Sequence, residues 1–182
     1  MVCDLKSAAA WIRENKDLFP IDIDNVFLAG DSSGGHTAIM AYLTWGQDIL
    51  SDDDKELPAI RGLLDFFGVS DIKKLSETAT GLSQEDNALL IPMLFETPED
   101  VYTGSCRCYI DLLEKLPPVI IMHGNKDRLV PLSQSVEFYN LLKERGCEVE
   151  FYMIDGADHG WLTFWGAPTK QVIIDFLKKH TD

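Results

Sequence analysis

The sequence is poor in cysteine and has no long apolar run. Its 182 residues include four cysteines, whereas a small protein stapled by disulfides carries more of them in a shorter chain. Cys106 and Cys108 have no second ligand pair nearby, so we expect ordinary thiols and no metal site. No apolar stretch approaches the roughly 18 residues that cross a bilayer, so no membrane span is predicted.

Basic residues are also scarce. Sixteen Lys and Arg residues stand against 30 Asp and Glu residues, which gives a formal net charge of −14 at pH 7. A nucleic-acid-binding protein needs a basic surface to displace the counterions of the phosphates, so we predict no nucleic-acid partner. The acidic field favours neutral or cationic small molecules as partners.

The sequence does contain a regular alternation of short apolar runs and helix-like stretches. The apolar runs, which suit strands buried on both faces, are residues 25–29, 60–69, 118–122 and 148–154. The helix-like stretches are residues 4–18, 36–45, 133–145 and 169–179. We expect Asp4 to cap the first helix and Gly146 to end the third. The alternation predicts a single α/β domain over residues 1–182, with a mostly parallel sheet of about four strands and flanking helices.

Residues 71–110 interrupt this alternation. They are punctuated by glycine and proline and contain a helical-looking segment from Gln84 to Phe95. An excursion of this length inside a compact domain is usually functional, so we interpret it as a lid-like segment. A surface elaboration without a role is the alternative.

A G-x-S-x-G motif, Gly30-Asp31-Ser32-Ser33-Gly34, lies between the first predicted strand and the next predicted helix. In this context a sharp turn lifts the serine hydroxyl above the end of the sheet, and the glycines let neighbouring backbone pass closely. Ser32 is therefore the candidate nucleophile, and the backbone N–H of Ser33 is the candidate oxyanion donor. The alternative is a glycine-rich turn with an incidental serine.

Two further polar residues follow later predicted strands. Asp127 comes just after the third strand, and His159 comes just after the fourth. Because the carboxyl ends of parallel strands share one edge of a sheet, both residues should meet Ser32 there. The chain order Ser, Asp, His is that of α/β-hydrolases. Asp155 and Asp158 are alternative acids, but they lie close to His159 in the sequence.

These residue types suit acyl transfer by a serine nucleophile. His159 would take the Ser32 proton and later protonate the leaving group, while Asp127 would fix the imidazole tautomer. This chemistry needs no metal and no organic cofactor. The candidate pocket residues, which adjoin the nucleophile or the base in the sequence, are Asp31, Trp161 and Trp165. We interpret His36 and His123 as packed residues with local hydrogen bonds.

The runs VFLAGDSSGGHTA, IMHGNKDRLVP and IDGADHGW resemble the α/β-hydrolase superfamily. Within it, the whole chain resembles carboxylesterases related to hormone-sensitive lipase and to bifunctional feruloyl and acetyl-xylan esterases. The resemblance implies that Ser32 is the nucleophile, Asp127 the acid and His159 the base. Ser33 stands where these esterases more often have alanine. Such motifs identify the superfamily but not the substrate.

The sequence lacks the His-Gly-Gly string with which the family supplies a second oxyanion donor. No strand-like run precedes Leu5, so the chain resembles the C-terminal part of a hydrolase, a truncated α/β-hydrolase fold. Its nucleophile strand would then lie at an exposed sheet edge, and such edges pair with other chains. We therefore expect a homodimer or a strand-swapped oligomer through this edge, and an activity reduced by the missing donor.

Three hypotheses for function follow. The first is a serine carboxylesterase acting on a small-molecule ester with a short acyl group, or on a carbohydrate or phenolic ester. The second is a catalytically impaired hydrolase fold that serves as a scaffold or binding module. The third is a serine peptidase similar to prolyl oligopeptidase, because that class shares the same motifs.

Overall fold

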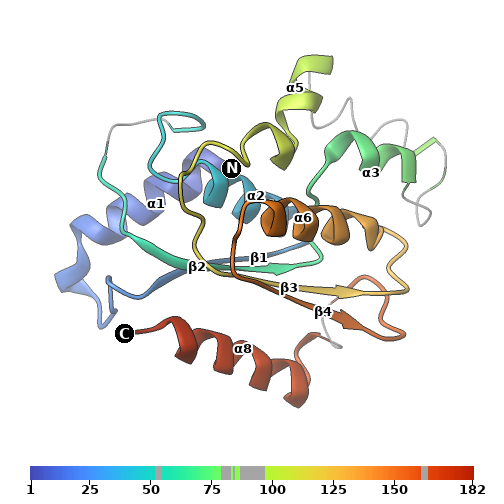
Figure 1. Cartoon of the computed structure of the whole chain (residues 1–182). Helices are drawn as coiled ribbons and strands as arrows, with labels where there is room; N and C mark the ends of the chain where they lie inside the picture. The colour runs from blue at the N-terminus through green and yellow to red at the C-terminus, as the bar shows by residue number, and fades with distance from the viewer. Residues whose placement is uncertain (52–54, 79–82, 84, 87–96, 161–163) are drawn as a thin grey trace.

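The computed structural model of the chain describes residues 1–51, 55–78, 83, 85–86, 97–160 and 164–182 (Figure 1). The strands are β1 (Val26–Asp31), β2 (Ile60–Phe66), β3 (Val119–Gly124) and β4 (Val149–Ile154). The α-helices are α1 (Val2–Glu14), α2 (Ser32–Leu43), α3 (Ile72–Thr78), α5 (Pro98–Thr103), α6 (Ser133–Glu144) and α8 (Ala167–His180). Two short 3₁₀ helices are η1 (Lys16–Leu18) and η2 (Cys106–Cys108).

The four strands of the described chain form one parallel sheet in the order β1-β2-β3-β4. At least one helix connects each strand to the next, as parallel pairing requires. This arrangement confirms the predicted α/β class with a mostly parallel sheet. Among the described strands β1 pairs only with β2, so β1 is an edge strand. The expected association of this edge with another chain stays a prediction.

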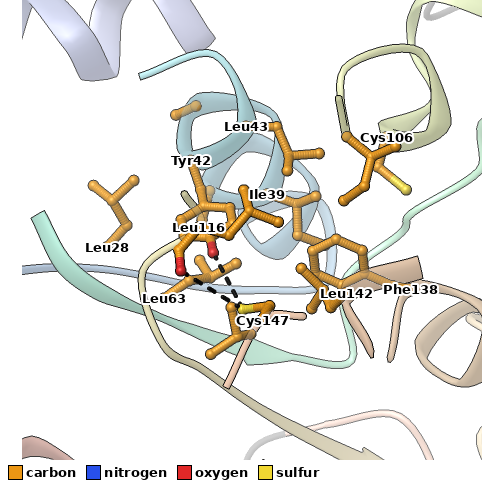
Figure 2. Close-up of a cluster of buried hydrophobic side chains, with 14 of the residues drawn as sticks. Leu28, Ile39, Tyr42, Leu43, Leu63, Cys106, Leu116, Phe138, Leu142 and Cys147 are labelled. Carbon is orange, nitrogen blue, oxygen red and sulfur yellow. Dashed lines mark hydrogen bonds between the residues drawn. The ribbon is translucent and has the colours of Figure 1, made fainter. Parts of the chain in front are cut away.

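Helices cover both faces of the sheet (Figure 1). α8 lies on one face, where Phe176 packs in a cluster with Leu64 of β2. α1, α2 and α6 lie on the other face, and Figure 2 shows the cluster between these helices and the sheet, which contains Leu63 of β2 together with Ile39 and Tyr42 of α2. Neighbouring strand residues point to opposite faces, so Leu63 and Leu64 fill different layers. Because helices cover both faces of the sheet, each strand is a continuous apolar run in the sequence.

The first helix differs from its prediction at both ends. Met1 is the N-cap of α1, so Asp4 is not the cap; its carboxylate lies in the first turn and binds the N-terminal amine at 2.8 Å. A negative charge in the first turn still complements the helix dipole. The helix ends at Glu14, and the rest of the predicted segment is the 3₁₀ turn η1.

Two predicted boundaries are wrong because the backbone turns sharply there. α2 begins at Ser32 rather than His36, since Ser32, at a φ of 52°, leads β1 directly into the helix. β2 ends at Phe66, because Phe67 has a φ of 44°, which is incompatible with an extended strand. The predicted end of α6 is confirmed at Gly146, whose φ is 71° and whose N–H donates to the Lys143 carbonyl.

The described start of the region 71–110 packs against the loop that follows β3. Val69, Ile72 and Leu75 form a buried cluster with Val130, and the Cys106 N–H donates to the Ser70 carbonyl at 2.9 Å. Most of the predicted helical segment from 84 to 95 lies outside the described residues, so the lid-like role stays a prediction. All four cysteines are thiols, as expected.

No helix in the described ranges is both long enough and apolar enough to cross a bilayer.

A buried lysine joins α1 to the far end of α2. Lys6 is 2% exposed, and its Nζ donates to the carbonyls of Thr44 at 2.7 Å, Gln47 at 3.3 Å and Ile49 at 2.7 Å. A helix leaves its last carbonyls without intrahelical donors, so the ammonium satisfies groups at and beyond the end of α2. Burial lowers the pKa of this amine.

Candidate active site

Ser32 lies at the sharp turn between β1 and α2. Its φ of 52° falls in the left-handed region, which costs a non-glycine residue about 1–3 kcal/mol. The turn brings Gly30 against Gly34: a Cβ added to Gly30 would lie 2.2 Å from the Gly34 carbonyl oxygen. Position 30 must therefore be glycine for the turn to keep this shape.

The three predicted polar residues meet at the carboxyl end of the sheet. Ser32 Oγ lies 2.9 Å from His159 Nε2, and His159 Nδ1 lies 2.8 Å from Asp127 Oδ2. Because an ionised carboxylate only accepts hydrogen bonds, Nδ1 carries the ring proton and Nε2 accepts from the serine hydroxyl. Hydroxyl, imidazole and carboxylate thus stand in the order that proton abstraction from a serine requires.

Hydrogen-bond donors surround the Asp127 carboxylate. Its Oδ1 accepts the N–H groups of Leu129 and Val130, each at 2.9 Å. Its Oδ2 accepts from His159 and lies 3.3 Å from His123 Nε2. Burial acts to raise the pKa of Asp127, but the hydrogen bonds from both histidines and from Val130 outweigh it and hold the pKa well below its usual range. The Asp127 carboxylate therefore stays charged, and oriented toward the imidazole, at neutral pH.

Asp158 ties together the loops that carry Asp127 and His159. Its Oδ1 accepts the N–H of His159 at 2.8 Å and the N–H of Arg128 at 3.2 Å, and its Oδ2 accepts Arg128 Nε at 2.9 Å. Asp155 instead binds a side-chain amide of the loop after β3 at 2.7 Å. The imidazole hydrogen bond belongs to Asp127, and neither alternative acid takes it.

The imidazole of His159 is packed on one side and reachable from another. Its side chain is 15% exposed, and its ring meets the Phe67 ring edge-on with centroids 4.7 Å apart. The Phe67 ring also packs on Phe164 at 4.5 Å. A hollow of about 280 Å³ beside the imidazole is lined by Arg128, Leu129, Asp158 and His159.

The remaining predicted site residues surround the nucleophile or lie farther away. Ser33 is the second residue of α2, and N–H groups in a first helical turn have no intrahelical acceptor. Asp31 is the N-cap residue of α2, and its side chain makes no capping hydrogen bond. Trp165 is 39% exposed and packs on Phe66 at 5.4 Å. Trp161 lies outside the described residues, and the oxyanion and pocket roles stay predictions.

Sequence reasoning missed Phe67 as part of this site, and it weighed Asp158 only as an alternative acid. The support from Phe67 depends on a left-handed backbone that nothing in the apolar run 60–69 announces. His36 is packed as expected, with Nδ1 2.9 Å from the Val69 carbonyl oxygen. His123 does make local hydrogen bonds as expected, but its proximity to Asp127 was not foreseen.

One group of potential metal ligands occurs in the described part of the chain, at the opposite end of the sheet. Ligand atoms of Glu148, Glu150 and His180 lie within 4.8 Å of one another. Lys179 Nζ already pairs with Glu148 at 2.6 Å and with Glu150 at 3.1 Å. The two carboxylates therefore share a lysine of α8 at the start of β4, far along the strands from Ser32.

The chain has clear relatives of known class. The sequence model of the BD-FAE family matches residues 1–142. Esterase LipC of Mycobacterium tuberculosis is 26% identical over 187 residues, which cover 98% of this chain and 46% of LipC. A truncated form of a carbohydrate esterase from gut microbiota superposes with a TM-score of 0.78 at 25% identity, over 98% of this chain and 67% of that one. Esterase B of Lactobacillus Rhamnosis, at 17% identity, shares the fold with a TM-score of 0.80 over 98% of this chain and 59% of its own.

The parallel sheet and the strand–turn–helix at Ser32 define a protein of the α/β-hydrolase superfamily. Since the family match covers most of the chain, the chain belongs to the BD-FAE family. This confirms the predicted resemblance to α/β-hydrolases of the carboxylesterase type. The chain spans less than half the length of the curated esterases it matches.

Proposed function

We propose that this chain is a serine carboxylesterase that cleaves small-molecule esters through an acyl-enzyme on Ser32. The observation that carries the proposal is the 2.9 Å contact between Ser32 Oγ and His159 Nε2, continued by the 2.8 Å contact between His159 Nδ1 and Asp127. Relatives named esterases support the ester bond as the bond cleaved.

In the acylation step, His159 Nε2 takes the hydroxyl proton while Ser32 Oγ attacks the ester carbonyl carbon. The imidazolium then gives this proton to the alcohol oxygen, the ester C–O bond breaks, and the acyl group remains on Ser32. A water molecule attacks the acyl-enzyme by the same route, which releases the acid and restores the serine. Asp127, held in the charged form, stabilises the imidazolium in both steps.

The backbone N–H of Ser33 is our proposed donor to the oxyanion, since it follows the nucleophile in the first turn of α2. One such donor contributes about 10²–10³ in rate. These 182 residues contain no His-Gly-Gly string. For this chain alone we therefore propose a rate lower by about that factor than in a hydrolase with both donors.

We propose short acyl esters of carbohydrates or phenolics as the substrates. The hollow of about 280 Å³ at His159 is slightly smaller than the usual ligand site, which favours a small acyl or alcohol group. A structural relative is named a carbohydrate esterase.

A fluorophosphonate probe, which reacts with activated serines, tests the proposal. We expect the intact chain to be labelled, Ser32→Ala to lose the label, and Ser33→Ala to keep it because the backbone N–H remains. Unlabelled intact chain would favour the impaired-scaffold alternative.

The choice between esterase and peptidase needs a second measurement. We expect hydrolysis of p-nitrophenyl acetate, and no hydrolysis of a prolyl amide, by the chain that the probe labels. The reverse preference would favour the alternative similar to prolyl oligopeptidase.

A further inference from the structure

His123 lies fully buried behind Asp127, and the esterase mechanism above does not use it. It belongs to β3 and is 0% exposed. Its Nδ1 lies 2.7 Å from Ser135 Oγ. Its Nε2 lies 2.7 Å from the Val130 carbonyl oxygen and 3.3 Å from Asp127 Oδ2. Both ring nitrogens are therefore engaged.

The partners of the ring determine where its proton sits. The Val130 carbonyl and the Asp127 carboxylate only accept hydrogen bonds, so Nε2 must carry a hydrogen. In the neutral ring Nδ1 is then an acceptor, and the hydroxyl of Ser135 donates to it. Ser135 is 1% exposed and lies in the first turn of α6. The start of α6 thus selects the tautomer of a histidine on β3.

We propose that Ser135 and His123 form a relay that positions Asp127, the carboxylate on which the proposed function rests. Ser135 holds the Nε2–H tautomer of His123, and His123 shares that N–H between the Val130 carbonyl and Asp127 Oδ2. The same carboxylate oxygen accepts from His159. His123 is therefore a positioning residue: it limits rotation of the carboxylate and moderates how strongly the carboxylate attracts the imidazolium of His159.

Acidic and aromatic side chains surround His123. Asp127 faces it from the loop after β3, and the carboxyl of Asp65, which is 1% exposed, faces it from β2. The Phe67 ring lies on another side with centroids 6.3 Å apart. Burial alone would raise the pKa of Asp127, but hydrogen bonds lower it overall, and the one from His123 contributes most to this lowering.

The test compares two substitutions that differ in one donor. His123→Gln places an amide N–H close to the Nε2 position, whereas His123→Leu has none. We expect His123→Leu to lose about 10- to 100-fold in kcat/KM for p-nitrophenyl acetate, the value of a hydrogen bond to a charged group, and His123→Gln to recover most of it. When the His123 N–H is removed, Asp127 attracts the protonated His159 imidazole more strongly. The acid limb of the plot of kcat/KM against pH therefore moves to higher pH in His123→Leu only.

Equal losses in both variants, with the acid limb unmoved, would mean that His123 only packs, and the inference would be wrong. Ser135→Ala serves if His123→Leu does not fold, because it removes one hydroxyl. It should lower kcat by about 3- to 10-fold at unchanged KM, and an unchanged kcat would overturn the relay.

Fluorophosphonate labelling of the unmodified chain tests the proposed function separately from the role of His123. If that labelling is absent, the positioning of Asp127 is followed by proton NMR of the His159 Nδ1–H. This signal should shift or broaden in His123→Leu and stay in place in His123→Gln. An identical signal in all three chains would refute the relay without reference to activity.

Discussion

The buried carboxyl of Asp65 should make the protein less stable as the pH rises through neutrality. Asp65 is 1% exposed; its Oδ1 accepts the Gly68 N–H at 2.9 Å, and its Oδ2 has no hydrogen-bond partner among the described residues. Burial raises the pKa of Asp65 from 3.8 to about 7, against the opposing influence of His123 and the Gly68 N–H. Between these two values the folded chain binds more protons than the unfolded chain, so stability falls as pH rises.

The size of the effect follows from the two pKa values. One unit of pKa difference corresponds to about 1.4 kcal/mol. With the unfolded carboxyl at 3.8 and the folded one at about 7, the loss between pH 5 and pH 8 is roughly 3 kcal/mol. The group is fully buried, so water does not screen this cost appreciably. Asp65→Asn keeps an oxygen for the Gly68 N–H but removes the titration.

Urea unfolding followed by tryptophan fluorescence at pH 5 and pH 8 measures this effect. For each chain we take the change in unfolding free energy between pH 5 and pH 8, and then subtract the value for Asp65→Asn from that for the wild type. Groups that titrate alike in both chains cancel in this difference. We expect a difference of about 3 kcal/mol. Asp111→Asn, at a side chain that is 81% exposed, should give no such difference. Equal pH dependence in wild type and Asp65→Asn would refute the reasoning.

Three other outcomes are expected. Gly30→Ala should cost about 3 kcal/mol or more of stability and abolish probe labelling, because the new Cβ would lie 2.2 Å from the Gly34 carbonyl oxygen. A Cβ at Gly34 would meet only Asp31 Oδ1, at 3.6 Å, so Gly34→Ala is the control. Thermal melts that show equal losses in the two variants would contradict this prediction. Lys6→Met should cost about 2–4 kcal/mol in urea unfolding, because it strands buried carbonyls, and a loss no larger than that of the exposed Lys16→Met would be inconsistent with this account. The edge of β1 should pair with that of a second copy, so light scattering at micromolar concentration should report a dimer or larger oligomer, and a clean monomer would exclude it.

The existence of the four strands and the order of the polar residues could be predicted because both are encoded by short local stretches of sequence. Ser32, Asp127 and His159 each lie within five residues after an apolar run, and parallel topology brings such positions to one edge. Gly146 similarly marks the end of α6 by its own backbone freedom.

Other features could not be predicted because they depend on tertiary partners. Phe67 adopts φ of 44° while its N–H donates to the Met122 carbonyl on a different strand. The role of His123 requires Ser135, twelve residues later, to meet it across the packing of α6 on β3. Asp158 was discounted as an acid for its closeness to His159, and no local pattern pointed to its hydrogen bonds with Arg128 on another loop.

The lysine that binds the carbonyls at the far end of α2 has a consequence for the position of the Ser32 hydroxyl. α2 is a rod of 12 residues, about 18 Å long, with Ser32 at one tip and the Lys6 ammonium clamping the carbonyls at and beyond the other. Because a helix is stiff, any shift of the end of α2 that Lys6 holds also shifts Ser32 at the other end. We therefore expect a substitution of Lys6 in α1 to change the position of Ser32 through α2, as well as to lower stability.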